Sequence, residues 1–137
     1  MQIDYLLLAE HAEVVGNKLY LMGGGWDQMN VPEAPANVRL ALAAGVRVDW
    51  EETNTSIPLL VRIEDDDAQE LFKLEGQINV GRPPNLVAGA SQLSQMTFTL
   101  QTSLPRLGGY RLMFIGGSGP AEVRRAIPFR LVKTATR

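Results

Sequence analysis

The sequence contains no cysteine and only one histidine, His11. The absence of cysteine excludes disulfides, cysteine nucleophiles and thiolate metal sites. His11 lies beside Glu10 and Glu13 and is the one candidate general base, but no recognised motif ties a serine or threonine to it. We therefore expect neither a catalytic residue nor a cofactor, and a protein that is not an enzyme.

Strong net charge and long apolar runs are also missing. The chain carries 13 basic and 15 acidic residues, a net charge of −2, which gives no electrostatic footprint for nucleic acid or an acidic membrane. No apolar run approaches the roughly 18 residues of a membrane span. The short run Leu6–Ala9 follows Asp4 and has no basic residue before it, so no signal peptide is predicted. We expect a soluble, cytoplasmic protein.

The composition that is present suits a folded domain. Of the 137 residues, 45% are apolar and 20% are charged, which is enough to build a core. The chain shows no internal repeat and no change of composition that would mark a second domain. We expect one domain over residues 1–137.

The most distinctive stretch runs from Gly16 to Asp27. Gly16-Asn17 is a tight-turn pair, and the alternating residues after it indicate a strand. The triplet Gly23–Gly25 permits two interpretations, a phosphate-cradling loop or a sharp backbone bend. Phosphate loops lead into a helix, whereas here Pro32 soon follows. We favour the bend, with Trp26 packed over it against the domain.

Rows of apolar residues with a period of two predict about eight strands. The clearest row, from Val38 to Trp50, leaves small residues on its second face: Ala41, Ala43 and Gly45. Small residues on that face would allow another layer of backbone to pack on it, or they would simply form an exposed surface. We predict the exposed surface. The other predicted strands are 3–15, 18–22, 57–63, 72–80, 96–104, 110–114 and 123–131, and Pro128 suggests that the last is an edge strand.

This strand pattern predicts an all-β fold, a two-sheet antiparallel β-sandwich with Greek-key-like connections. The corner from Leu104 to Tyr110 supports it, because a tyrosine that opens a strand after such a turn resembles the tyrosine corner of these sandwiches.

Two groups of residues are candidates for binding. The acidic turn holding Asp65, Asp66 and Asp67 has the oxygen ligands that calcium prefers, but contiguous acids in a hairpin turn are usually a solvated tip, and we predict no metal site. An exposed tryptophan can stack on a ligand, whereas a buried one covers a core. The irregular 81–92 loop is long, and loops of this length are uncommon unless they pack on the domain or bind a partner. The candidate ligand or interface surface is Trp26, Asp27, Trp50, Arg82 and Asn85.

Several stretches together resemble an uncharacterised bacterial family, the domain of unknown function numbered six-nine-four-one. They are 3–9, 16–20, 23–27, 50–54, 80–84, 108–110 and 127–131, and they span nearly the whole chain. The resemblance implies a small bacterial β-sandwich protein and implies no activity. The chain departs from the family's acidic pair and glycine at the hairpin turn, where it has Asp65-Asp66-Asp67-Ala68.

The residues therefore favour a non-catalytic protein-interaction or assembly module. We expect a homo-oligomer or a complex with another protein. The reason is that apolar or small side chains also occur on the strand faces opposite the predicted core rows, at Leu6, Leu8, Ala41 and Ala43. The alternative is a β-sandwich that binds a small ligand or carbohydrate through Trp26, Trp50 and the 81–92 loop.

Overall fold

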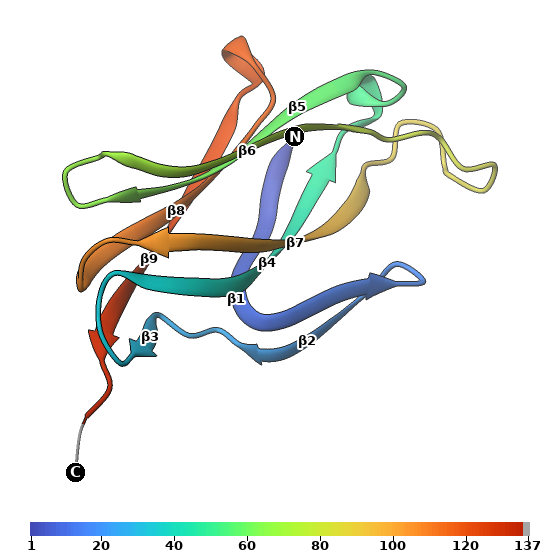
Figure 1. The fold of residues 1–137 in the computed structure, drawn as a ribbon. Helices are drawn as coiled ribbons and strands as arrows, with labels where there is room; N and C mark the ends of the chain where they lie inside the picture. The colour runs from blue at the N-terminus through green and yellow to red at the C-terminus, as the bar shows by residue number, and fades with distance from the viewer. Residues whose placement is uncertain (136–137) are drawn as a thin grey trace.

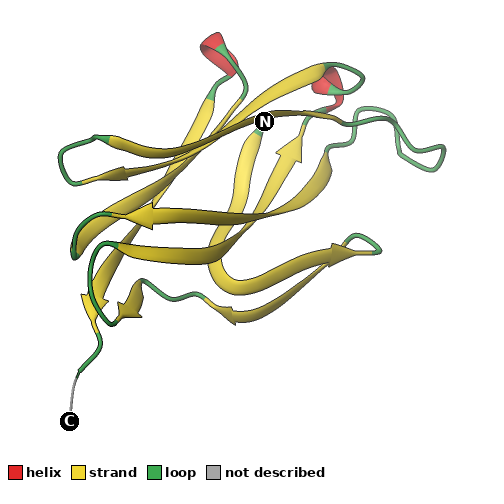
Figure 2. Ribbon diagram, in the orientation of Figure 1, coloured by secondary structure: helices red, strands yellow, loops and turns green. Residues whose placement is uncertain are grey.

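The structure is a computed structural model that describes residues 1–135, and it consists of two β-sheets packed face to face (Figures 1 and 2). Sheet A has the strand order β2-β1-β4-β7 and sheet B the order β3-β9-β8-β5-β6. All neighbouring strands are antiparallel except the parallel pair β3 and β9. The elements are β1 Gln2–Val15, β2 Lys18–Gly24, β3 Gln28–Val31, β4 Ala36–Val48, the 3-10 turn η1 Trp50–Glu52, β5 Ser56–Asp65, β6 Glu70–Asn79, β7 Gln92–Leu104, β8 Gly108–Gly116, the 3-10 turn η2 Gly119–Ala121 and β9 Val123–Lys133.

The main core lies between the sheets and is built from the predicted apolar rows. Leu40, Leu42 and Val46 of β4 are fully buried there and meet Leu112 and Phe114 of β8 in the same cluster. The alternation of side chains along each strand places these residues on the inner faces. The predicted two-sheet antiparallel sandwich is confirmed.

The connection from β7 to β8 carries the chain from sheet A to sheet B, and Tyr110 holds it. The Tyr110 hydroxyl donates a hydrogen bond to the Arg106 carbonyl, 2.5 Å away, and accepts one from the Arg106 N–H at 3.1 Å. The Tyr110 ring is buried and stacks on Phe129, with centroids 5.7 Å apart. The tyrosine corner predicted from the sequence is therefore present.

A second, smaller core lies on the outer face of sheet A. The β1–β2 hairpin bends back over that face, and its Ala9 and Ala12 form a buried cluster with Ala41 and Ala43 of β4 (Figure 1). At the hairpin turn, the Asn17 carbonyl accepts a hydrogen bond from Gln95 of β7 at 2.5 Å. The predicted small-residue surface is wrong, because a further backbone layer covers it.

This close approach explains why β4 has a glycine at position 45. The Tyr5 ring of β1 lies over Gly45, and a Cβ atom there would come within 2.1 Å of the ring. The Tyr5 hydroxyl continues to β7, where it donates to Gln95 Oε1 at 2.6 Å. Gly45 therefore makes room for a tyrosine that ties three strands together.

Two further expectations need correction, and one strand was not predicted. Trp50 does not end the β4 row, because the strand stops at Val48 and Trp50 begins η1. Strand β9 is not an edge strand, since β3 covers it from Arg130 to Lys133. Pro128 precedes that stretch, so its missing N–H costs no bond to β3. Strand β3 itself was not predicted, because four residues are too few for a visible period.

We predict that Gly45→Ala destabilises the protein by about 1–3 kcal/mol, because the added methyl must displace the Tyr5 ring. The matched control is Gly76→Ala on β6, where a Cβ would meet no atom within 4 Å. Urea unfolding measures both variants. Equal stability of the two would contradict the role given to Gly45.

Candidate functional site

The structure separates the predicted candidate surface into two places. Trp26 and Asp27 lie in the link between β2 and β3, whereas Trp50 lies in η1 and Arg82 and Asn85 lie in the loop after β6. The β2–β3 link and η1 are at opposite ends of β4 (Figure 2). The five residues therefore do not form one surface.

Arg82 and Trp50 do come together. The Arg82 guanidinium stacks on the Trp50 ring at 3.7 Å from its centroid. Its Nε donates to Thr53 Oγ1 at 2.6 Å and its Nη2 donates to the Trp50 carbonyl at 2.9 Å. Arg82 therefore fastens the base of the loop to η1 and covers one face of Trp50. A polar groove of about 510 Å³ adjoins it, lined also by Asn17 and Gln95, but not by Asn85.

Trp26 packs on the domain, as predicted. Its ring meets Phe129 edge-on, with centroids 6.4 Å apart, and borders the main core. The indole N–H is enclosed and meets no acceptor among residues 1–135. The glycines before it bend the backbone where the chain leaves sheet A, since Gly23 and Gly25 have φ of 61° and 80°. Asp27 is exposed, and its carbonyl accepts a hydrogen bond from the Arg130 N–H.

The acidic turn is less solvated than the sequence suggested. Asp66 and Asp67 are exposed, but Asp65 and the preceding Glu64 are buried. Asp65 Oδ1 accepts hydrogen bonds from the backbone N–H groups of Gln69 and Asp67, both at 2.9 Å, and Arg106 donates to Oδ2 at 2.8 Å. Asp65 therefore holds the turn and joins it to the tyrosine corner.

Glu64 is buried because it has arginine partners on the outer face of sheet B. Arg111 of β8 donates to its carboxylate, and Arg62 Nε lies 3.5 Å from the second oxygen. His11, in contrast, is exposed on the hairpin and lies opposite Met22 of β2. Among residues 1–135, no three His, Asp or Glu side chains are grouped as a metal would require.

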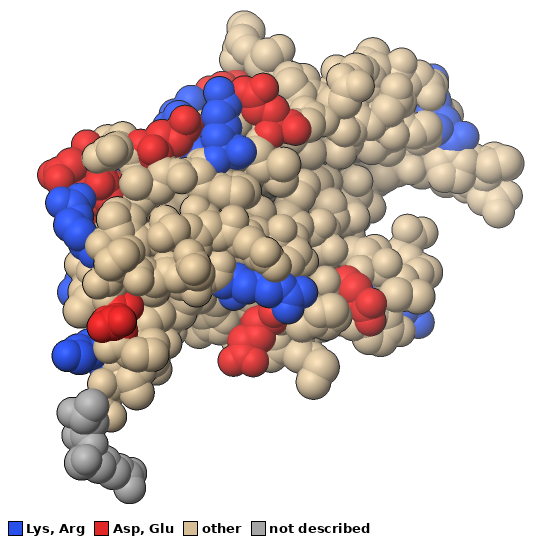
Figure 3. Space-filling view, in the orientation of Figure 1, with Lys and Arg blue, Asp and Glu red and all other residues tan. Residues whose placement is uncertain are grey.

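The open edge formed by β7 is a feature of the surface that was not predicted from the sequence. This strand has 13 residues and pairs with β4 without a register shift, and nothing in the described chain pairs with its other side. It contains no Asp, Glu, Lys or Arg. In Figure 3 a mostly tan band crosses the middle of the molecule, where β7 runs, with charged side chains above and below it. The lack of charged residues was visible in the sequence, but only the strand order shows that this uncharged strand is an edge.

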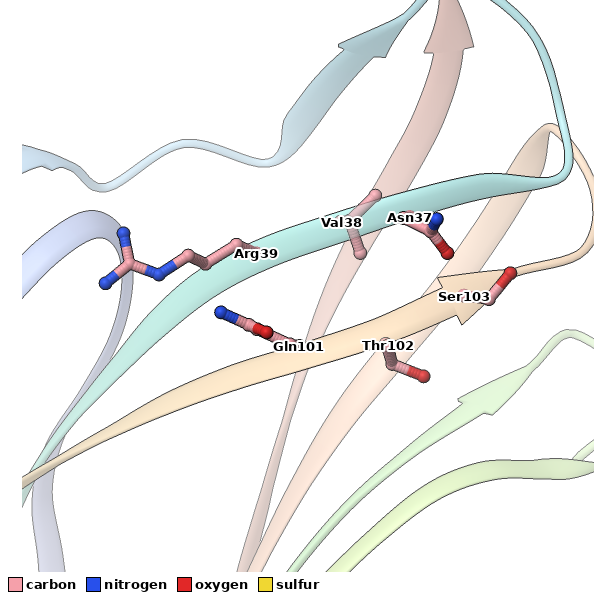
Figure 4. A pocket seen from close by; sticks show the side chains of 6 residues that line it. All are labelled: Asn37, Val38, Arg39, Gln101, Thr102 and Ser103. Carbon is pink, nitrogen blue, oxygen red and sulfur yellow. The ribbon is translucent and has the colours of Figure 1, made fainter.

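A shallow hollow of about 420 Å³ follows the same strand toward its end. Its lining residues are Asn37, Val38 and Arg39 of β4 and Gln101, Thr102 and Ser103 of β7 (Figure 4). Arg39 is the charged group of this lining, and the β7 side offers only amide and hydroxyl groups. The hollow therefore lies over the pairing of β4 with β7 and not along the open edge.

The fold and surface define a class, a small antiparallel β-sandwich with an open strand edge. The sequence profile of DUF6941, a family of unknown function, matches residues 4–125. The chain belongs to this family, as its resemblance predicted. No curated protein matches the chain. The described residues include no helix with the length and apolarity that a membrane span needs.

We predict that the stabilising effect of Asp65 is lost in acid. The N–H of Gln69, with those of Asp67 and the Arg106 guanidinium, holds the pKa of Asp65 below its ordinary value. A carboxylate with a lowered folded-state pKa stabilises the fold above its unfolded pKa of about 3.9 and stops doing so as the pH falls through the folded value. Asp65→Asn should therefore lower the free energy of unfolding at pH 7 more than in strong acid. Urea unfolding at both pH values measures this, with the exposed Asp66→Asn as control. An equal cost at both would contradict it.

We predict that Ala68→Gly stabilises the acidic turn. Ala68 has a φ of 62°, a left-handed conformation that costs an L-residue roughly 1 kcal/mol and glycine nothing. Thermal unfolding should show a Tm several degrees higher. In the control, Ala88→Gly, the exposed alanine lacks a positive φ, so the change should lower the Tm slightly. A decrease of the Tm for both variants would show that the Ala68 backbone is not strained.

Proposed function

We propose that this protein is a non-catalytic interaction module that assembles with further copies of itself, in the bacterial cytoplasm. The observation that carries the proposal is the open edge of β7. A strand edge presents a row of unpaired N–H and C=O groups, which pair readily with another strand. Natural proteins normally protect such edges with charges, prolines, bulges or short strands.

The other three edges of the sandwich have such protection. Strand β3 has four residues and β2 has seven, ending in the bent glycine stretch. Strand β6 carries Glu70, Lys73 and Glu75. Among the four edges in residues 1–135, β7 is the one that combines length, unbroken register and a complete lack of charge. This contrast supports a specific use for the β7 edge.

The residues expected from the sequence to form an interface are buried inside the fold. Leu6 and Leu8 belong to the main core, and Ala41 and Ala43 to the second core under the hairpin. None of the four is available to another chain in this fold. The proposal of assembly therefore rests on β7 and not on these residues.

The arrangement of the tryptophans gives less support to the alternative, a carbohydrate or small-ligand binder. Sugar stacking needs an accessible flat aromatic face. Arg82 occupies one face of Trp50, and Trp26 packs against Phe129. We therefore favour the interaction module.

We predict that the parent protein scatters light as a species heavier than its 15.0 kDa chain and that Thr99→Lys dissociates it. Thr99 is exposed on β7, and a lysine there would place like charges near each other when two such edges pair. The association should weaken at least about tenfold, equivalent to about 1.4 kcal/mol.

The matched control is Asn30→Lys, which adds the same charge at an exposed position of β3, the edge of sheet B opposite β6. It should leave the mass unchanged, and circular dichroism confirms the fold of both variants. A parent protein that stays monomeric up to roughly 100 μM, well above the affinity of a specific assembly, would overturn the proposed self-association.

A further inference from the structure

An apolar groove of about 220 Å³ opens beside the β7 edge, between the two sheets. Leu74 and Ile78 of β6 line one side, and Met96 and Phe98 of β7 line the other. Leu74 is 38% exposed, although it lies on the strand face that points toward the core. The sandwich is therefore incompletely closed on the side where both sheets end.

We propose that a second copy of this chain closes the groove, with its β7 strand paired antiparallel to β7 around a two-fold axis near Phe98. This inference rests on the proposed function and adds the geometry of the assembly. The axis lies at Phe98 because that residue is the middle of the 13-residue strand, so all of β7 overlaps. The two A sheets then form one continuous sheet of eight strands.

The alternation of side chains explains why the second copy fits the groove. Residues of one parity point to the same face of a sheet across paired strands. Met96 and Phe98 of the second copy therefore lie on the inner side, next to the groove of the first. The Thr97 and Thr99 side chains lie on the outer side, where uncharged hydroxyl groups pair without repulsion.

In this dimer, charged residues of β6 in one chain would lie near residues of opposite charge on β6 of the second copy. Lys73 and Glu75 flank Leu74, and their side chains lie 2.8 Å apart within one chain. A two-fold axis reverses the direction of β6 in the second copy, so Lys73 of one chain is on the side of Glu75 of the other. This opposite-charge arrangement favours a second copy over a partner of strong single charge. An isologous contact of this kind uses both β7 edges and ends at a dimer.

The lack of cysteine makes the pairing directly measurable. With the axis at Phe98, Leu93 of one chain lies opposite Ser103 of the other, and both side chains are exposed. The double variant Leu93→Cys/Ser103→Cys should form a disulfide-linked dimer under mild oxidation, seen on a non-reducing gel. Neither single variant should do so, because each cysteine would lie opposite a non-cysteine residue. Cross-linking of Leu93→Cys alone, or none in the double variant, would overturn the proposed pairing.

A second measurement tests the groove. Leu74→Asp should weaken the dimer at least about tenfold in light scattering, because the buried seam would receive two carboxylates. Val87→Asp in the exposed loop is the control and should leave it unchanged. An unchanged mass for Leu74→Asp would show that the groove lies outside the interface. A parent dimer without the Leu93–Ser103 cross-link would refute this pairing and leave the proposed function standing, whereas a monomeric parent refutes both.

Discussion

Strand β4 packs its larger side chains, Leu40, Leu42 and Val46, against sheet B, and its small ones, Ala41 and Ala43, against the β1–β2 hairpin. Each buried Leu or Val contributes about 1.5–3 kcal/mol relative to its exposed state, so this row is a large part of the stability. The small residues of the opposite face contribute little area of their own. They allow a second backbone to approach, and that approach brings Tyr5 and Asn17 to Gln95 of β7.

Much of this fold could be predicted, because several signals in the sequence are local. The period of two identified the main strands, the Gly16-Asn17 pair gave the hairpin turn with φ of 57° and 61°, and Tyr110 gave the corner. What failed depends on contacts between distant segments. The cover over Ala41 and Ala43 comes from residues about 30 positions away in the sequence, and a stripe of alanines reads the same whether it is covered or bare.

The candidate site was less predictable for the same reason. Trp26 and Trp50 were singled out as residue types, but only the fold shows that they lie far apart and that Arg82 stacks on one of them. The burial of Asp65 could not be read from a run of acids, since it depends on Arg106, which is 41 residues away. The β7 edge illustrates the converse. Its uncharged sequence was visible from the start, but strand order alone makes it an edge.

The place of β9 in sheet B has a consequence for synthesis on the ribosome. Strand β9 is the last of the nine to emerge, yet it lies between β3 and β8 and is the strand with which β3 pairs. Sheet A is complete once β7 has left the exit tunnel, whereas sheet B lacks two of its five strands at that point. The nascent chain therefore presents a finished four-stranded sheet with its apolar face still partly bare. Chaperone contact during this interval would protect the inner face of β4 and the uncharged edge of β7 until the final strand closes the sandwich.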